Sequence, residues 1–197
     1  MFVEGGGDSR QEQTPLRVGF GQLIKQWLGE LPQPTVIACG GRARAFRDFS
    51  IAVRKYPGDL CLLLVDSEAP VGDGVAAWEH VLRRVGDGWV RPDGVGEDRL
   101  FFMAQAMEAW LIADAEALAK FYGQKFRAQD IPARANVEDV AKQDLFEALR
   151  KATRDTRAYS KRDGFALIGR ISAARVCERS PVHARRFFQR LSEAMAR

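Results

Sequence analysis

One stretch without polar alternation constrains the fold most strongly: residues 60–65 read Leu-Cys-Leu-Leu-Leu-Val. A strand with one face in water alternates apolar and polar side chains, whereas a central parallel strand is buried on both faces and does not. The run therefore predicts an interior strand of an α/β sheet. The first charged residues come directly after the run, in the sequence Asp66-Ser67-Glu68.

Strand and helix patterns alternate over the first 114 residues. Apolar runs predict further strands at residues 1–3, 35–39 and 100–104, and helical spacing predicts helices at 16–28, 43–55, 75–85 and from 107. This order favours a mainly parallel four-stranded sheet flanked by helices. Residues 115–197 carry one-sided apolar spacing and predict a helical extension, in which Ser180 and Pro181 are expected to be an N-cap and first-turn pair. We expect an α/β core over 1–114 and a helical part over 115–197, packed as one compact domain.

Composition argues against several classes of site. The chain has two histidines, His80 and His183, which argues against a histidine-based metal site or catalytic triad. Its three cysteines show no paired spacing and are predicted to be buried thiols. No apolar stretch approaches the ~20 residues that span a bilayer, and no signal peptide is evident. We therefore expect a cytoplasmic protein with no membrane partner.

Charge is distributed unevenly along the chain. Residues 115–197 hold 18 Lys and Arg against 10 Asp and Glu, whereas residues 1–114 hold 12 against 16. An acidic part beside a basic part suits a polyanionic substrate that is bound through cations and guanidinium groups. A solvated helical surface rich in arginine is the alternative.

Acidic residues follow two of the predicted strands. Glu4 and Asp8 flank a run of three glycines after the first strand, and Asp66 and Glu68 follow the third. Ligands of open α/β sheets bind at the carboxyl ends of strands, so these side chains are expected to converge. If the chain stays extended there, Asp66 and Glu68 lie on the same side, because side chains alternate with period two. Oxygen ligands favour a hard ion, and we predict one or two Mg²⁺ or Mn²⁺ ions. The alternative is an ordinary turn, because Asp, Ser and Gly are common turn formers.

A second glycine cluster, Gly40-Gly41-Arg42, lies between a predicted strand and a predicted helix. Free backbone N–H groups and the arginine there are predicted to bind a phosphate of a nucleic acid. A simple tight turn is the competing interpretation. Neither glycine cluster contains the Gly-Lys-Ser/Thr of a nucleotide P-loop, which argues against ATP hydrolysis by this chain. Trp89, in a Gly- and Asp-rich loop, is the best candidate for an exposed ring that stacks on bases.

With Glu4-Gly5 ending the first strand and Asp66-Ser67-Glu68 following a later one, the chain resembles the Toprim fold. That domain occurs in topoisomerases, DnaG-type primases and several nucleases. Its pattern is Glu-Gly followed by Asp-x-Asp, and Glu68 departs from it by one methylene. Only three residues precede Glu4, fewer than a Toprim first strand normally has, which leaves a start upstream of Met1 open.

More narrowly, the chain resembles the RloG/AbiL-like Toprim proteins of bacterial anti-phage loci, which are similar to the Toprim half of the OLD-family nucleases. The stretches that carry this resemblance are 3–8, 40–42, 64–68, 105–111 and 159–161. Asp163 departs from it, because a basic or His-containing segment is expected there. The resemblance implies a metal-dependent nuclease that acts on RNA or single strands rather than duplex DNA. It also implies an ATPase partner, and it leaves a homodimer open.

If the chain hydrolyses phosphodiester bonds with the help of divalent ions, these residues have the following predicted roles. Asp66 and Glu68 are the predicted principal metal ligands, Glu4 is a ligand or general base, and Asp8 completes the first cation site. The resemblance to the two-metal OLD pattern adds Glu108, and it adds Lys161 as the group that neutralises charge on the scissile phosphate or leaving oxygen.

Two other functions compete with the nuclease. A non-catalytic Toprim subunit of an ATPase-containing complex would use the same fold for assembly alone. A metal-dependent glycosyltransferase also carries an acidic-x-acidic motif after a buried strand, but it usually needs a larger nucleotide-sugar domain than this length allows. Metal-dependent activity distinguishes the nuclease from the non-catalytic subunit, and binding of a UDP-sugar would distinguish the glycosyltransferase.

Overall fold

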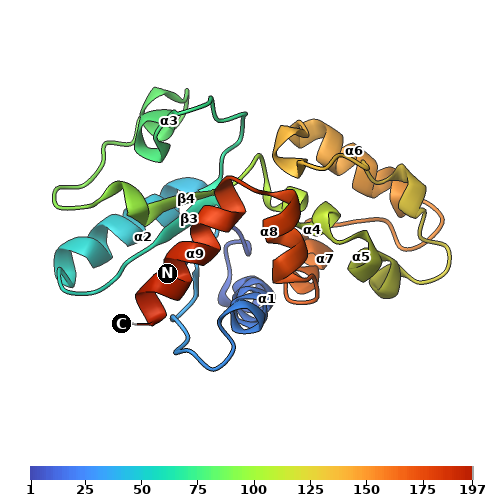
Figure 1. Ribbon diagram of the computed structural model, residues 1–197, viewed down its shortest axis with the longest axis horizontal. Coiled ribbons are helices and arrows are strands. Elements are labelled where there is room, and N and C mark those ends of the chain that lie inside the picture. The colour runs from blue at the N-terminus through green and yellow to red at the C-terminus, as the bar shows by residue number, and fades with distance from the viewer. Residues whose placement is uncertain (197) are drawn as a thin grey trace.

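A four-stranded sheet, parallel throughout, forms the centre of the molecule. The computed structural model describes residues 1–196. Its strands are β1 (Phe2–Val3), β2 (Ile37–Ala38), β3 (Leu63–Asp66) and β4 (Leu100–Met103), in the order β2-β1-β3-β4 (Figure 1). Val3 pairs with Leu64, and Asp66 pairs with Met103. The predicted α/β fold with a mainly parallel four-stranded sheet is confirmed, and β1 lies inside the sheet although it is only two residues long.

Helices cover both faces of this sheet. On one face α1 (Arg10–Leu28) and α9 (His183–Met195) bury Leu64 and Phe101; on the other α2 (Arg42–Lys55) and α3 (Ala77–Arg83) bury Leu63 and Val65. Neighbouring residues of β3 therefore belong to different cores, as the period of two in a strand requires. Both faces are apolar, which explains why the run through residues 60–65 contains no polar residue.

The remaining helices extend the molecule beyond the sheet (Figure 1). They are α4 (Met107–Ala113), α5 (Ala115–Tyr122), α6 (Lys142–Ala152), α7 (Lys161–Leu167) and α8 (Ala173–Arg179), with 3-10 turns at Glu97–Arg99, Ala128–Asp130 and Val137–Asp139. Every residue of α4 is buried. The ring of Trp110 in α4 lies against Phe20 of α1 and against Phe187 and Phe188 of α9. One hydrophobic core thus includes residues from both ends of the chain.

Three local expectations differ from the structure. Helix α1 begins at Arg10, six residues before the predicted start, because Ser9 and Glu12 form a capping box. Helix α9 begins at His183, three residues after the predicted N-cap; Ser180 is the C-cap of α8, and its hydroxyl also accepts the N–H of Ala184 at 3.2 Å. Trp89 is buried rather than exposed: its ring stacks on Phe46 at 4.5 Å between centroids. The prediction of an exposed stacking platform at Trp89 was wrong.

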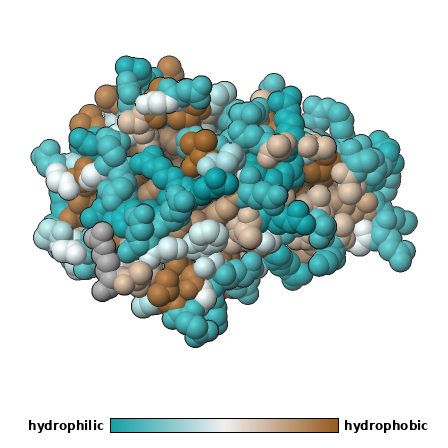
Figure 2. Space-filling view, in the orientation of Figure 1, coloured by the Kyte–Doolittle hydropathy of each residue, from teal (hydrophilic) through white to brown (hydrophobic). Residues whose placement is uncertain are grey.

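The surface and the thiols agree with the composition. Hydrophilic residues cover most of the face in Figure 2, and apolar residues are scattered between them. Cys39, Cys61 and Cys177 are buried free thiols, as predicted. Among the helices of residues 1–196, none combines the length and the apolarity that a bilayer crossing requires.

Replacing Trp110 with alanine is expected to lower the free energy of unfolding by about 3–5 kcal/mol, because the large ring is fully buried among aromatic neighbours. Urea unfolding followed by circular dichroism measures the change. Val85→Ala is the matched control, since Val85 is 95% exposed and its truncation should change stability by less than about 0.5 kcal/mol. If Trp110→Ala lowers the free energy of unfolding by less than about 1 kcal/mol, Trp110 does not anchor α4 in the hydrophobic core as described.

Candidate metal centre

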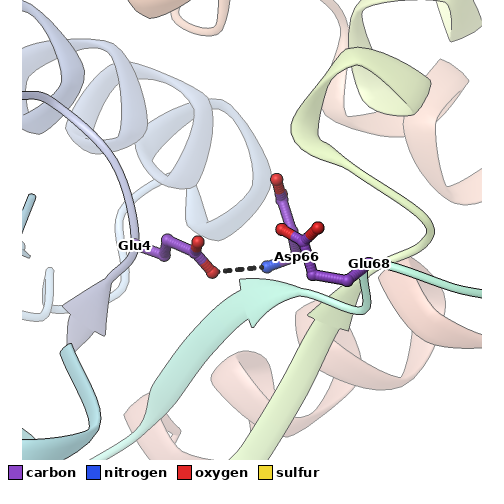
Figure 3. A group of neighbouring side chains, drawn as sticks. All are labelled: Glu4, Asp66 and Glu68. Atoms are coloured by element: carbon purple, nitrogen blue, oxygen red, sulfur yellow. Dashed lines mark hydrogen bonds between the residues drawn. The ribbon is translucent and has the colours of Figure 1, made fainter. Parts of the chain in front are cut away.

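Three carboxylates meet at the carboxyl end of the sheet. Glu4 directly follows β1, Asp66 is the last residue of β3, and Glu68 lies two residues further (Figure 3). Each offers an oxygen atom, and these oxygens lie within 4.8 Å of one another. We call Glu4, Asp66 and Glu68 the acidic cluster. The predicted convergence of these three side chains is what the structure contains.

The backbone around the acidic cluster explains how the side chains meet. The N–H of Glu4 donates to the carbonyl of Leu64 at 3.0 Å, which continues the pairing of β1 with β3 beyond Val3. Gly5 and Gly40 exchange two backbone hydrogen bonds, and Gly40 has φ +75° with no room for a Cβ beside the carbonyl of Gly7. Glycine is required at that close approach. The two hydrogen bonds between Gly5 and Gly40 hold the turn after β1 against the turn after β2.

Glu68 reaches the cluster by a route that the sequence did not predict. We expected Asp66 and Glu68 to share one side of an extended chain, but Glu68 has φ +67°, a left-handed conformation that is rare outside glycine. Its N–H donates to the carbonyl of Gln105 at 2.9 Å, which holds this backbone in place. The bend turns the chain away after β3 and keeps the Glu68 carboxylate near Asp66.

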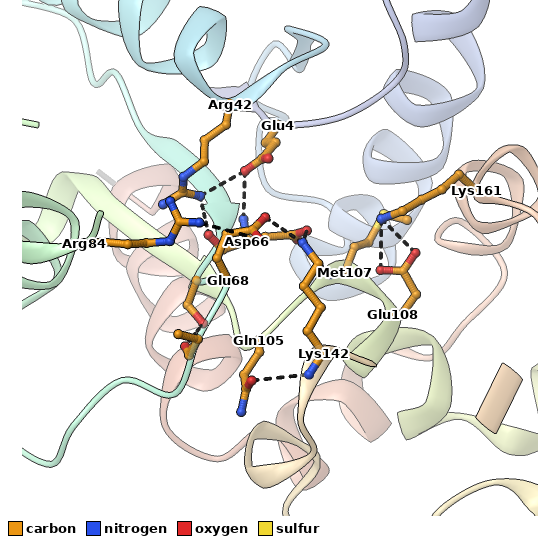
Figure 4. Close-up of polar contacts among 12 residues, drawn as sticks. Glu4, Arg42, Asp66, Glu68, Arg84, Gln105, Met107, Glu108, Lys142 and Lys161 are labelled. Atoms are coloured by element: carbon orange, nitrogen blue, oxygen red, sulfur yellow. Dashed lines mark hydrogen bonds and ion pairs between the residues drawn. The ribbon is translucent and has the colours of Figure 1, made fainter. Parts of the chain in front are cut away.

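Asp66 is the most perturbed acid of the cluster. Its Oδ1 accepts a hydrogen bond from the N–H of Met107 at 2.8 Å, and its own N–H donates to Glu4 Oε2 at 3.1 Å (Figure 4). Burial, with the negative charges of Glu4 and Glu108, raises the pKa of Asp66 to about 7 against the opposing effect of nearby lysines. Burial also raises the pKa of Glu4, although Arg42 opposes that shift. Burial at this site therefore disfavours the ionised forms of Asp66 and Glu4.

A fixed arginine network closes one side of the acidic cluster. The guanidinium of Arg42 makes two hydrogen bonds to Asp87, at 2.7 and 2.8 Å, one to Glu4 at 3.1 Å, and another to the Asp66 carbonyl. Arg84 bonds the same Asp87 at 3.1 Å and lies 3.8 Å from Glu68. Because Arg42 is fully engaged, this side chain does not offer a free guanidinium. Phosphate binding by Gly40, Gly41 and Arg42 stays a prediction, and the turn itself has the structural role described above.

A lysine closes the other side. The Nζ of Lys142, the first residue of α6, lies 2.6 Å from Glu68 Oε1 and 3.6 Å from Asp66 Oδ2. The N–H of Lys142 also donates to the Gln105 side chain at 3.3 Å. Sequence reasoning missed this residue because 74 positions separate Lys142 from Glu68. Asp87 was missed for the same reason, because it lies 45 positions from Arg42.

Glu108 and Lys161 form a separate pair beside the cluster. Glu108 is 0% exposed, and its carboxylate accepts a hydrogen bond from the Tyr159 hydroxyl at 2.7 Å. Lys161 Nζ lies 3.0 Å from Glu108, while its side chain is 50% exposed. The two residues that the family resemblance adds thus contact each other. Glu108 does not belong to the group whose oxygens lie within 4.8 Å, although its charge acts on Asp66.

Asp8 is the predicted ligand that the structure leaves outside the acidic cluster. It is exposed, and the group of converging oxygens does not include it. Gly5, Gly6 and Gly7 all have positive φ and lead the chain from β1 to the start of α1. The role of Asp8 as the residue that completes the first cation site stays a prediction.

The donor set fits a hard divalent cation. Three carboxylates from two strand ends supply only oxygen ligands, which suit Mg²⁺ or Mn²⁺ better than softer ions. Burial raises the pKa values of Asp66 and Glu4, with repulsion from neighbouring acids as a smaller cause, and a bound cation would favour the ionised form of both carboxylates. Glu4, Asp66 and Glu68 are the residues that could hold the ion.

A family model described as "Domain of unknown function (DUF4276)" matches residues 3–192. The chain belongs to the DUF4276 family. Comparisons with curated proteins and with solved structures found no match. The DUF4276 description names no activity, so the chemistry of the acidic cluster carries the functional argument.

The raised pKa of Asp66 predicts a pH dependence of stability for the chelator-treated DUF4276 chain. Folded Asp66 binds a proton more tightly than unfolded Asp66, so stability falls as pH rises from about 4 to about 7. The fall amounts to a few kcal/mol, on the order of 1.4 kcal/mol per pKa unit. Asp66→Asn should flatten this slope in urea unfolding measured with EDTA. Asp73→Asn, at an exposed position, is the control. Equal slopes of stability against pH in the unaltered chain, Asp66→Asn and Asp73→Asn would contradict the prediction.

Proposed function

We propose that this chain is a divalent-metal-dependent nuclease that hydrolyses phosphodiester bonds, with RNA or single-stranded nucleic acid as its favoured substrate. The observation that carries the proposal is the meeting of Glu4, Asp66 and Glu68 at the carboxyl edge of a parallel sheet. Ligands of open α/β sheets bind at this edge. Carboxylates collected there at the cost of burial and mutual repulsion are typical of a functional site.

Each residue of the site has a role in this reaction. Asp66 and Glu68 would hold Mg²⁺ or Mn²⁺, which when bound supplies Lewis-acid stabilisation of the phosphoryl charge and an acidified water nucleophile. Glu4 is oriented by Arg42 and by the Asp66 N–H, and its raised pKa suits a general base as well as a ligand. Lys161, half exposed beside Glu108, supplies a positive charge for the scissile phosphate or leaving oxygen.

The wider setting of the proposal rests on charge and on resemblance. The excess of Lys and Arg in residues 115–197 supports a polyanionic substrate. Resemblance to the RloG/AbiL-like Toprim proteins supports a role as effector of a bacterial anti-phage system with an ATPase partner. A non-catalytic subunit of such a complex is the alternative.

The test is cleavage of labelled single-stranded RNA, single-stranded DNA and duplex DNA by the purified chain in Mn²⁺. Asp66→Asn and Glu68→Gln should each lower the rate about 100-fold or more, since even outer-shell partners of a metal typically change activity about 10–100-fold. EDTA should abolish cleavage, and added Mn²⁺ should restore it.

Glu116→Gln is the matched control, because Glu116 is an exposed acid of α5 that pairs with Arg175 and lies outside the acidic cluster. It should cleave at the rate of the unaltered chain. Circular dichroism checks that each variant is folded. Full activity in folded Asp66→Asn and Glu68→Gln would contradict the site, and no cleavage of any substrate would favour the non-catalytic subunit.

A further inference from the structure

Lys142 places a positive charge where the acidic cluster would hold its metal ion. Its Nζ lies 2.6 Å from Glu68 and 3.6 Å from Asp66 (Figure 4). Carboxylate oxygens bind Mg²⁺ at about 2.0–2.1 Å and an ammonium group at about 2.7–2.9 Å. The lysine and a divalent ion would therefore use the same oxygen atoms, and both cannot occupy the position between these carboxylates.

Lys142 is also the cation of this site that can leave most readily. Arg42 is tied by Asp87, Glu4 and a backbone carbonyl, and Arg84 shares Asp87 with it. The Lys142 ammonium bonds only acids of the cluster among the described residues, and its side chain is 29% exposed on a flexible four-carbon stem. Its backbone is held separately by Gln105, so the side chain can move while α6 stays in place.

The charges around the site favour exchange over joint occupancy. Counted as ionised, the paired carboxylates are Glu4, Asp66, Glu68 and Asp87, and the paired cations are Arg42, Arg84 and Lys142. Their net charge is −1. A divalent ion added to this set would bring it to +1, whereas a divalent ion that replaces the ammonium would bring it to zero.

We propose that Lys142 is an exchangeable counter-cation that regulates metal binding at the acidic cluster. In the metal-free chain its ammonium occupies the cation position, and a divalent ion binds by displacing it into solvent. Lys142 thereby weakens the metal affinity of the site and sets the ion concentration at which the site fills. This inference rests on the proposed function, because it requires the acidic cluster to bind a divalent ion.

The test is a titration of the full, chelator-treated chain with Mn²⁺, in which free Mn²⁺ is followed by electron paramagnetic resonance. Lys142→Met keeps the length of the stem and removes the competing charge. It should bind Mn²⁺ about tenfold more tightly or better, since hydrogen bonds between charged groups are the stronger class. Lys151→Met replaces an exposed lysine of the same helix and should leave the affinity for Mn²⁺ unchanged.

The outcomes separate this inference from the proposed function. If the unaltered chain binds Mn²⁺ and Lys142→Met binds it equally or more weakly, exchange is wrong and the metal site stands. If neither chain binds Mn²⁺, the metal site itself is wrong, and the inference fails with it. Tighter binding by Lys142→Met supports exchange even if no nucleic acid is cleaved.

A second measurement uses the unaltered chain and so does not depend on the folding of a variant. Acetylation of lysines by an N-hydroxysuccinimide ester, read by peptide mass spectrometry, reports how free each ammonium group is. Mn²⁺ should raise the labelling of Lys142 several-fold and leave Lys151 unchanged. Labelling of Lys142 that stays constant or falls in saturating Mn²⁺ would overturn the proposal.

Discussion

The buried carboxylate of Asp66 is the interaction on which the architecture of the site depends. Its Oδ1 receives the N–H of Met107 at the start of α4, and its backbone N–H contacts Glu4 after β1. Its carbonyl receives Arg42 from α2, and Lys142 of α6 lies 3.6 Å from its second oxygen. A buried charge is costly unless it is hydrogen-bonded and paired. Satisfying this one residue therefore fixes the relative positions of two strand ends and three helices.

Stability alone gives little reason for such a site. Buried ion clusters can often be replaced by apolar residues without loss, because desolvation offsets much of the attraction between the charges. Here burial and neighbouring acids raise the pKa of Asp66 to about 7, so the folded chain carries a cost at neutral pH. A divalent cation bound among these carboxylates would offset that cost. Arg42 and Arg84 give partial neutralisation from fixed positions, and Lys142 gives it from a movable one.

The sequence predicted those features that depend on local pattern. The uninterrupted apolar run before Asp66 indicated a strand buried on both faces, and the positions of Glu4 and Asp66 at strand ends indicated a shared edge. The capping box at Ser9 and Glu12 is also a local start signal, and it begins α1 six residues before the apolar spacing does. The prediction that Glu68 joins the cluster assumed an extended chain, but the backbone at Glu68 is left-handed.

The features that escaped prediction depend on contacts between distant residues. Lys142 and Glu68 are 74 positions apart, and Arg42 and Asp87 are 45 apart, so no spacing rule relates them. Trp89 lies in a segment with the composition of an exposed loop, yet Arg42 sits 4.6 Å from its ring centroid and Phe46 stacks against it. Tertiary packing decides such positions, and local composition does not report it.

The central claim is that carboxylates from the ends of β1 and β3 bind one divalent cation together. Anomalous diffraction from crystals soaked in Mn²⁺ tests it most directly, because the signal locates the ion without assumptions about activity. The account predicts a peak with oxygen atoms of Glu4, Asp66 and Glu68 at about 2.0–2.2 Å. A fully soaked crystal with no peak among these three residues would contradict it.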